Sequence, residues 1–173
     1  TAYDISACLV GSEMCIRDRI TWYGKTLKNF DTDDKGECQW APGGNFAVRK
    51  SRYQELSGFD INFIGNAMLE DADFGFKIIR NGGRVIYEPS PVMEHLRVTL
   101  GGTRREPSSK GMYYRSHNTI YFLRKHKLIL RILPAVFYLA AVAFKDLIKR
   151  KHGPLAIFWA PIGIIRGFFT KIQ

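Results

Sequence analysis

The stretch that decides the fold is LEDADFGFKIIRNGGRVIY, residues 69–87. Acidic residues lead it, and three apolar residues follow at roughly helical spacing: Phe74, Ile78 and Ile79. Asn81-Gly82-Gly83 then supplies residues that tolerate the left-handed backbone with which helices end. The aliphatic and aromatic residues of 84–87 favour a strand. The stretch therefore predicts a helix that begins at residue 70 or 71 and ends near 80, followed by a strand.

Upstream of this stretch, the sequence alternates turns with short elements. Residues 40–45, Trp-Ala-Pro-Gly-Gly-Asn, are typical of a turn in which adjacent glycines are free to take positive φ. Residues 46–49 favour a strand. Ser51 followed by Gln54 matches a capping box, which predicts a helix from about residue 52. Gly58 is expected to end that helix. Strands and helices in alternation predict an α/β fold.

The N-terminal segment does not look native. Residues 8–19, CLVGSEMCIRDR, resemble a translated sequencing-adapter read-through that recurs in assembled metagenomic proteins. The segment has neither sustained alternation nor a helical stripe, so we exclude 1–19 from the fold and expect the natural chain to extend further upstream. The alternative is a genuine short strand at 7–10 with a turn after it. We divide the remaining chain into 20–111, which bears the candidate site, and a tail, 112–173.

Charge is divided unevenly along the chain. Residues 1–95 contain 11 Lys or Arg and 14 Asp or Glu, whereas residues 96–173 contain 15 Lys or Arg and 2 Asp or Glu. A tail with this much positive charge is typical of proteins that bind either nucleic acid or anionic lipid. The three cysteines match no zinc pattern and no disulfide framework, which favours a reducing, cytoplasmic compartment.

The tail contains two apolar stretches that are short for a membrane span and are interrupted by charge. Residues 128–144 include Arg131 and Pro134, which we expect to kink a helix, and residues 155–169 include Arg166. Both fit amphipathic helices lying in the headgroup layer, with their basic residues on anionic lipid. The alternative is two ordinary helices packed on the catalytic domain. His117 and His126 lie among basic residues and are expected to face solvent or headgroups.

Three segments occur in an order typical of one enzyme family. Gly43-Gly44-Asn45-Phe46-Ala47-Val48-Arg49 comes first, Glu70-Asp71-Ala72-Asp73 second, and Val85-Ile86-Tyr87-Glu88-Pro89, followed by His95, third. This ordered set resembles the second half of family 2 glycosyltransferases, over about residues 38–97. The resemblance implies a partial GT-A fold that lacks the N-terminal nucleotide-binding half. This chain alone is therefore expected to be inactive.

The resemblance also implies an inverting transfer of a sugar from a nucleotide-sugar donor. Asp71 would be the catalytic base, because a carboxylate in reach of a hydroxyl can take its proton, and the first turn of a helix keeps it ionised. Glu70 would orient acceptor hydroxyls or support Asp71. Taken alone, both acids could simply be helix N-terminal charges.

Other site residues follow from the same resemblance. Those expected to bind substrate are Trp40, Gly43, Gly44, Asn45 and Asp73. Trp40 could stack on a sugar or belong to the core, and the glycines could form a plain turn. His95 is the candidate ligand for a divalent metal, Mg²⁺ or Mn²⁺, held mostly by the missing half. Residues 31–34, Asp-Thr-Asp-Asp, follow no hydrophobic strand and are interpreted as a solvated acidic turn.

The acceptor is expected to be a glycan or a lipid-linked sugar of cell-envelope or exopolysaccharide synthesis, at the cytoplasmic face of the membrane. Two other classes of function stay open: a non-catalytic membrane-associated fragment, and a basic nucleic-acid-binding module. Long aliphatic runs between the tail's basic residues disfavour nucleic acid, and no recognised nucleic-acid motif is present.

Overall fold

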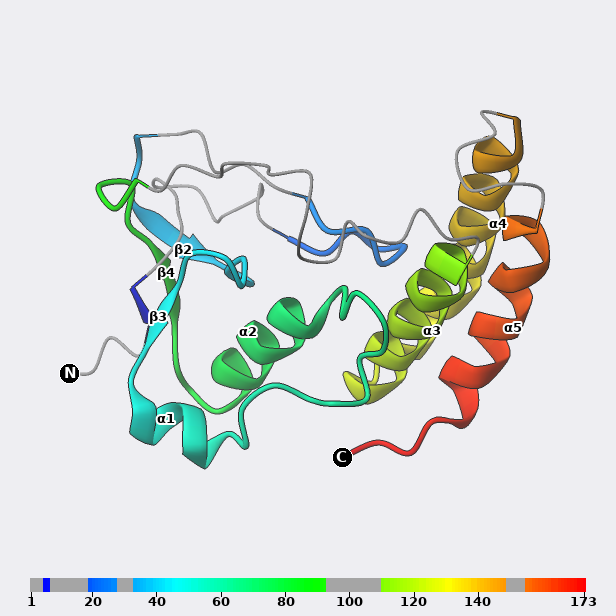
Figure 1. Cartoon of the computed structure of the whole chain (residues 1–173). Helices are drawn as coiled ribbons and strands as arrows, with labels where there is room; N and C mark the ends of the chain where they lie inside the picture. The colour runs from blue at the N-terminus through cyan, green and yellow to red at the C-terminus, as the bar shows by residue number, and fades with distance from the viewer. Residues whose placement is uncertain (1–4, 7–18, 28–32, 93–109, 149–154) are drawn as a thin grey trace. The chain divides into compact units, whose positions relative to one another are not determined.

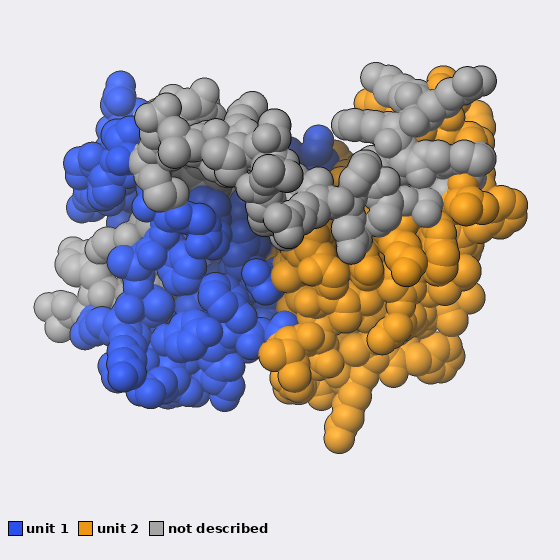
Figure 2. Space-filling view, viewed as in Figure 1, with its two compact units in different colours: residues 1–21, 25–60, 70–95 blue, residues 22–24, 61–69, 96–173 orange. Residues whose placement is uncertain are grey.

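The computed structural model describes residues 5–6, 19–27, 33–92, 110–148 and 155–173. They form two compact units, coloured separately in Figure 2. Unit 1 comprises the described residues within 1–21, 25–60 and 70–95, and unit 2 those within 22–24, 61–69 and 96–173. Unit 1 combines a small sheet with two helices, while the regular structure of unit 2 is helical. The predicted α/β class is confirmed at this level.

The sheet of unit 1 has the strand order β2-β4-β1-β3. Its strands are β1 (Ile5–Ser6), β2 (Gly36–Cys38), β3 (Ala47–Val48) and β4 (Val85–Tyr87), drawn in Figure 1. β4 pairs antiparallel with β2 and parallel with β1, and β1 pairs antiparallel with β3. The strands predicted within 46–49 and 84–87 are therefore present with shorter bounds.

β1 falls within the segment that the sequence marks as non-native. Ile5 pairs with Val48 on one side and with Val85 on the other, so β1 lies between β3 and β4. Backbone pairing over two residues uses only N–H and C=O groups and is open to many sequences. The origin of residues 1–19 therefore stays a prediction, and the alternative strand at 7–10 lies outside the described residues.

Helix α2 (Glu70–Arg80) follows its prediction closely. Phe74 and Ile78 are buried, whereas Ile79 is 43% exposed and does not belong to the core. The helix ends in a Schellman motif, in which Gly83 N–H donates to Ile78 O (2.9 Å) and Gly82 N–H donates to Ile79 O (3.1 Å). Gly82 takes the left-handed conformation with φ +74° that this ending requires.

Helix α1 (Lys50–Glu55) starts earlier than the capping box predicted. Its N-cap is Arg49, and no side chain caps it, so Ser51 lies inside the helix and the predicted box is wrong. The end is near the predicted place. Gly58 N–H donates to Tyr53 O (2.8 Å), but the left-handed backbone begins at Ser57, with φ 58°.

An aromatic cluster lies between the sheet and helices of unit 1. The rings of Phe46, Tyr53 and Phe59 pack against Phe74 of α2, with centroids 5.3–6.5 Å apart. Gly75 lets α2 approach the chain closely, because a Cβ there would lie 2.5 Å from Gln39 O. The core that positions the start of α2 therefore depends on large aromatic rings and on the absence of a side chain at Gly75.

Unit 2 consists of α3 (Lys110–Lys125), the 3₁₀ turn η2 (Ile129–Arg131), α4 (Ile132–Ile148) and α5 (Ala156–Phe169), with the loop 61–69. The two apolar stretches of the tail are helical, as predicted. Pro134 lies in the first turn of α4, where its missing N–H has no helical acceptor, so no interior kink is needed. No helix among the described residues is long and apolar enough to cross a membrane.

Helix α3 is enclosed, and α5 packs closely on it. A Cβ at Gly163 would lie 2.3 Å from Tyr113 O, and one at Gly167 would lie 2.6 Å from His117 O. All residues of α3 from 116 to 123 are buried, including the polar Ser116, His117, Asn118 and Thr119. The polar side chains of α3 therefore face the inside of unit 2.

Candidate functional site

The acidic pair at the start of α2 lies beside the Gly-Gly turn. Asp71 Oδ2 accepts a hydrogen bond from Gly43 N–H at 3.4 Å, although the residues are 28 positions apart in the sequence. Asp71 Oδ1 accepts from Ala72 N–H at 2.8 Å, in the first turn of the helix. Two of the three segments singled out in the sequence thus meet at one carboxylate.

The Gly-Gly turn leaves open space beside Asp71. Asn45 N–H donates to Pro42 O at 3.1 Å, which closes a four-residue turn. Gly43 and Gly44 are exposed, and a Cβ at either would meet no atom within 4 Å. The predicted turn is therefore present, and neither glycine uses the positive φ that it is free to take. What the glycines provide here is an uncovered backbone next to the carboxylate.

Glu70 and Asp71 differ in electrostatic setting. Partial burial, and next the neighbouring charge of Asp71, raise the pKa of Glu70 above its ordinary value. Glu70 therefore holds a proton more readily than an exposed glutamate does. Both carboxyl groups can accept hydrogen bonds from hydroxyl groups.

A small hollow lies next to Asp71. It is lined by Ala41, Phe46, Phe59, Asp71, Phe74, Gly75 and Val85, with an empty volume of about 220 Å³, open solvent included. Among the described residues that line it, Asp71 alone is ionisable. The three phenylalanines of this lining were not predicted as site residues, although each directly follows a residue of interest: Asn45, Gly58 and Asp73. Phe74 is 2% exposed and belongs to the core, whereas Phe46 and Phe59 are partly exposed.

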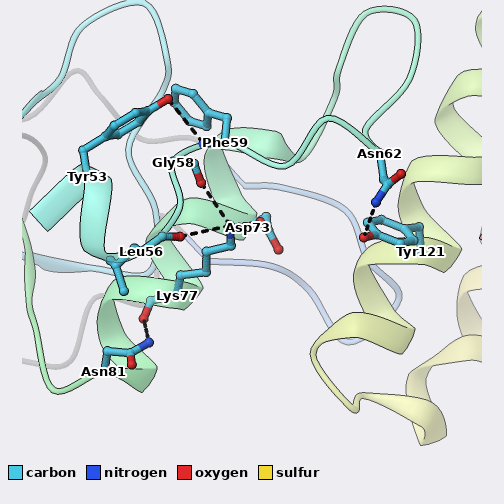
Figure 3. A network of polar contacts seen from close by, with 9 residues as sticks. All are labelled: Tyr53, Leu56, Gly58, Phe59, Asn62, Asp73, Lys77, Asn81 and Tyr121. Carbon is cyan, nitrogen blue, oxygen red and sulfur yellow. Dashed lines mark hydrogen bonds and ion pairs between the residues drawn. The ribbon is translucent and has the colours of Figure 1, made fainter. Parts of the chain in front are cut away.

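Two residues expected to bind substrate are buried instead. Trp40 is 1% exposed, so its ring offers no face to a sugar and belongs to the core, the alternative left open in the sequence analysis. Asp73 is fully buried, and its Oδ2 lies 3.7 Å from Lys77 Nζ. Lys77 also donates to Gly58 O at 3.0 Å, which ties α2 to the end of α1 (Figure 3). In this structure Asp73 has no exposed surface for a substrate, and its buried pair with Lys77 holds α2 in place.

Asn45 is exposed at the turn, as a substrate-binding residue would be. Its Nδ2 donates to Pro91 O at 3.3 Å, which connects the turn to the segment after β4. The third sequence segment thus reaches the turn through its backbone. His95, the predicted metal ligand, and Asp31 lie outside the described residues, while Asp33 and Asp34 are exposed, as expected for a solvated turn.

A metal site is not built from the part of the chain that the structure describes. No group of three His, Cys, Asp or Glu side chains there could hold a metal ion. Glu70 and Asp71 on their own are two ligands at most, fewer than the oxygen set that Mg²⁺ or Mn²⁺ requires. The predicted metal therefore gets no ligand set from the described residues.

Both tail histidines lie inside unit 2, so their predicted exposure is wrong. His126 is 3% exposed. His117 is fully buried, with Nδ1 2.8 Å from Asn118 Oδ1 and Nε2 2.8 Å from Thr170 Oγ1. Asn118 Oδ1 also accepts from Ile64 N–H, so it is an acceptor, and His117 Nδ1 carries the proton. Burial, above all, lowers the pKa of His117.

The same network holds the loop 61–69 and the end of α5. Asn118 Nδ2 donates to Ile64 O at 3.1 Å, and Asn62 Nδ2 donates to the Tyr121 hydroxyl at 3.2 Å (Figure 3). Arg124 donates to Gly167 O and Thr170 O. These contacts connect α3 to the loop 61–69 and to the end of α5 within unit 2, so the role of these side chains is structural.

No protein-family model matches the chain, and no curated protein or solved structure matches it.

Proposed function

We propose that this chain is the acceptor-side part of an inverting, family 2-type glycosyltransferase with a GT-A fold, in which Asp71 is the catalytic base. The observation that carries the proposal is the hydrogen bond between Asp71 Oδ2 and Gly43 N–H. It joins two of the three motifs on which the resemblance rests. The open glycine turn gives a hydroxyl room to approach the carboxylate, and the phenylalanine-lined hollow is beside it.

In the proposed reaction, an acceptor hydroxyl hydrogen-bonds to Asp71. As its oxygen attacks the anomeric carbon of the donor sugar, the hydroxyl proton passes to the Asp71 carboxylate. The bond from the anomeric carbon to the phosphate oxygen breaks, and the nucleoside diphosphate leaves with the electron pair. Attack opposite the leaving group inverts the anomeric centre. Glu70, with its raised pKa, orients a second acceptor hydroxyl.

The donor side of the reaction needs parts beyond the described residues. The nucleotide sugar is expected to bind a βαβ half, and a divalent cation would neutralise charge on the leaving diphosphate. The acceptor we propose is a glycan or lipid-linked sugar of the cell envelope or an exopolysaccharide, at the cytoplasmic face of the membrane.

The test is made in the longer protein encoded by the genomic contig that carries this sequence. We expect Asp71→Asn to lower kcat for sugar transfer by about 10²–10⁴-fold, the usual contribution of a general base, while nucleotide-sugar binding stays unchanged. Asp33→Asn, which removes an exposed carboxylate outside the site, is the matched control. Transfer at near wild-type rate by Asp71→Asn would refute the base. A contig that encodes no nucleotide-binding half in an intact gene would sink the glycosyltransferase proposal.

A further inference from the structure

Helices α4 and α5 of unit 2 are apolar on the side that faces solvent. In α4, the residues that pack inward are Ile132, Ala135, Leu139 and Ala143. Large exposed side chains recur on its other side at helical spacing: Leu133, Phe137, Phe144 and Ile148. A helix on the surface of a soluble domain normally carries polar residues there. α4 therefore has a second apolar face that the rest of unit 2 leaves uncovered.

Helix α5 repeats the arrangement. Its inner side is made of small residues that pack on α3, among them Gly163 and Gly167. Its exposed apolar residues are Phe158, Ile162, Ile165 and Phe169, spaced by four, three and four positions. α4 and α5 contact each other as well as α3 (Figure 1). Exposed apolar side chains on neighbouring helices mark an interaction surface, since scattered single residues would not keep this spacing.

The charges around these two stripes are almost all positive. The described residues 110–148 and 155–173 contain nine Lys or Arg and one Asp or Glu. Four of the cations lie near the ends of the apolar stripes: Arg131 before α4, Lys145 in its last turn, Arg166 in the last turn of α5, and Lys171 after it. In the sequence, Lys149, Arg150 and Lys151 follow α4. Apolar side chains bordered by cations match the acyl boundary and the anionic headgroups of a bilayer.

We propose that the outward faces of α4 and α5 dock unit 2 on an anionic lipid surface, with the apolar stripes at the acyl boundary and the flanking cations on headgroups. This binding does not depend on the proposed transfer reaction. An anionic lipid surface accounts for both the exposed apolar side chains and the positive charge. A soluble apolar partner would explain the exposed phenylalanines and leave the one-sided charge without a function, whereas nucleic acid would explain only the charge.

The test is flotation of the full chain with phosphatidylcholine vesicles that contain or lack phosphatidylglycerol. We expect binding that requires phosphatidylglycerol and weakens as salt is raised. Phe169→Asp, at a position 85% exposed, should lower the vesicle partition coefficient by about tenfold or more, because burial of a phenylalanine ring is lost. Ile61→Asp is the matched control, since that residue is 82% exposed in the loop 61–69 and the charge change is identical.

Phe169→Trp keeps the apolar character and should bind as the wild type does, which separates loss of docking from loss of folding. Absence of flotation by the wild type at low salt would overturn the proposal. So would an equal loss in Ile61→Asp, since the effect would then be one of net charge alone. A concentration-dependent dimer in sedimentation equilibrium, without flotation and abolished by Phe169→Asp, would assign the face to a second copy and overturn the lipid surface.

Discussion

The two units place their polar and apolar side chains in opposite ways. Unit 1 buries aromatic rings around α2 and leaves the carboxylates of Glu70 and Asp71 partly open beside the glycine turn. Unit 2 encloses the polar side chains of α3 and leaves phenylalanines of α4 and α5 exposed. A solvent-exposed carboxylate is common on protein surfaces and does not by itself indicate a functional site. A carboxylate that accepts a hydrogen bond from an exposed glycine backbone, as Asp71 does, is a better candidate for a catalytic group. Exposed phenylalanines are unfavourable in water and so suggest a surface that is covered in use.

The largest expected effect on stability distinguishes two carboxylates of the same helix. Asp73→Ala should destabilise unit 1 by about 3 kcal/mol, since removing one partner of a buried ion pair leaves the other without compensation. Asp71→Asn should change the free energy of unfolding by no more than about 0.5 kcal/mol, because Asp71 is partly open. Urea unfolding monitored by circular dichroism measures both. The double variant Asp73→Ala with Lys77→Met should recover part of the loss. Equal effects of Asp73→Ala and Asp71→Asn would break the assignment of one acid to structure and the other to the site.

The next effect compares two glycines of unit 1. Gly75→Ala should cost about 2 kcal/mol, because the new Cβ would lie 2.5 Å from Gln39 O and 2.8 Å from Trp40 Cα, so the backbone must shift. Gly43→Ala should be within about 0.5 kcal/mol of the wild type, because its Cβ would meet nothing within 4 Å and its φ is not positive. Thermal unfolding of the two variants side by side measures this difference. A costly Gly43→Ala would mean that the turn is packed rather than open.

Unit 2 should respond to pH through His117. Its pKa is lower in the folded protein than in the unfolded chain, chiefly because of burial and also because of the charge of Arg166. The unfolded chain therefore binds the extra proton more readily. The stability that the neutral ring contributes is present above about pH 6.5, the unfolded value, and is lost as pH falls toward the folded pKa.

The loss cannot exceed about 1.4 kcal/mol per pH unit, since one proton is involved. Urea unfolding of unit 2 at pH 7.5 and 5.5 measures it. His117→Asn should be less stable at both values and should lose this part of the pH dependence. Arg166, Arg124 and Tyr121 are the other charged or titratable groups near the ring, and the ordinary pKa values of these side-chain types lie well above this range. A pH slope that persists in His117→Asn would move the dependence to another group.

The sequence predicted local structure well where local chemistry decides it. The Asn81-Gly82-Gly83 ending of α2 came out as predicted, because a Schellman motif depends on a few adjacent residues. Trp40 and Asp73 were assigned to substrate because a motif shows residue types and not burial. His117 looked exposed among basic neighbours, yet its Nε2 contacts Thr170, 53 residues further along the chain. Its Nδ1 contacts Asn118, which in turn bonds to Ile64, 54 residues before Asn118. Only the tertiary fold brings such partners together.

The smallest effect tests whether Glu70 and Asp71 act as a pair. The pKa of Glu70 is raised in the folded protein, so folding disfavours its ionised form. This loss of folding stability is absent below about pH 4.3, the unfolded value, and is fully present once the pH exceeds the folded pKa. Glu70→Gln should therefore stabilise unit 1 slightly at pH 7, by at most about 0.5 kcal/mol given its partial exposure, and not at pH 4.

The pairing itself is measured by NMR titration of the Glu70 carboxyl carbon. In Asp71→Asn, the pKa of Glu70 should move down toward its ordinary value but stay above it, because burial is the larger cause and the charge of Asp71 the smaller. Asp33→Asn removes an exposed charge elsewhere and should leave the titration unchanged. If Glu70 titrates identically in Asp71→Asn and in the wild type, the two carboxylates do not sense each other. The raised pKa of Glu70 would then be due to burial alone.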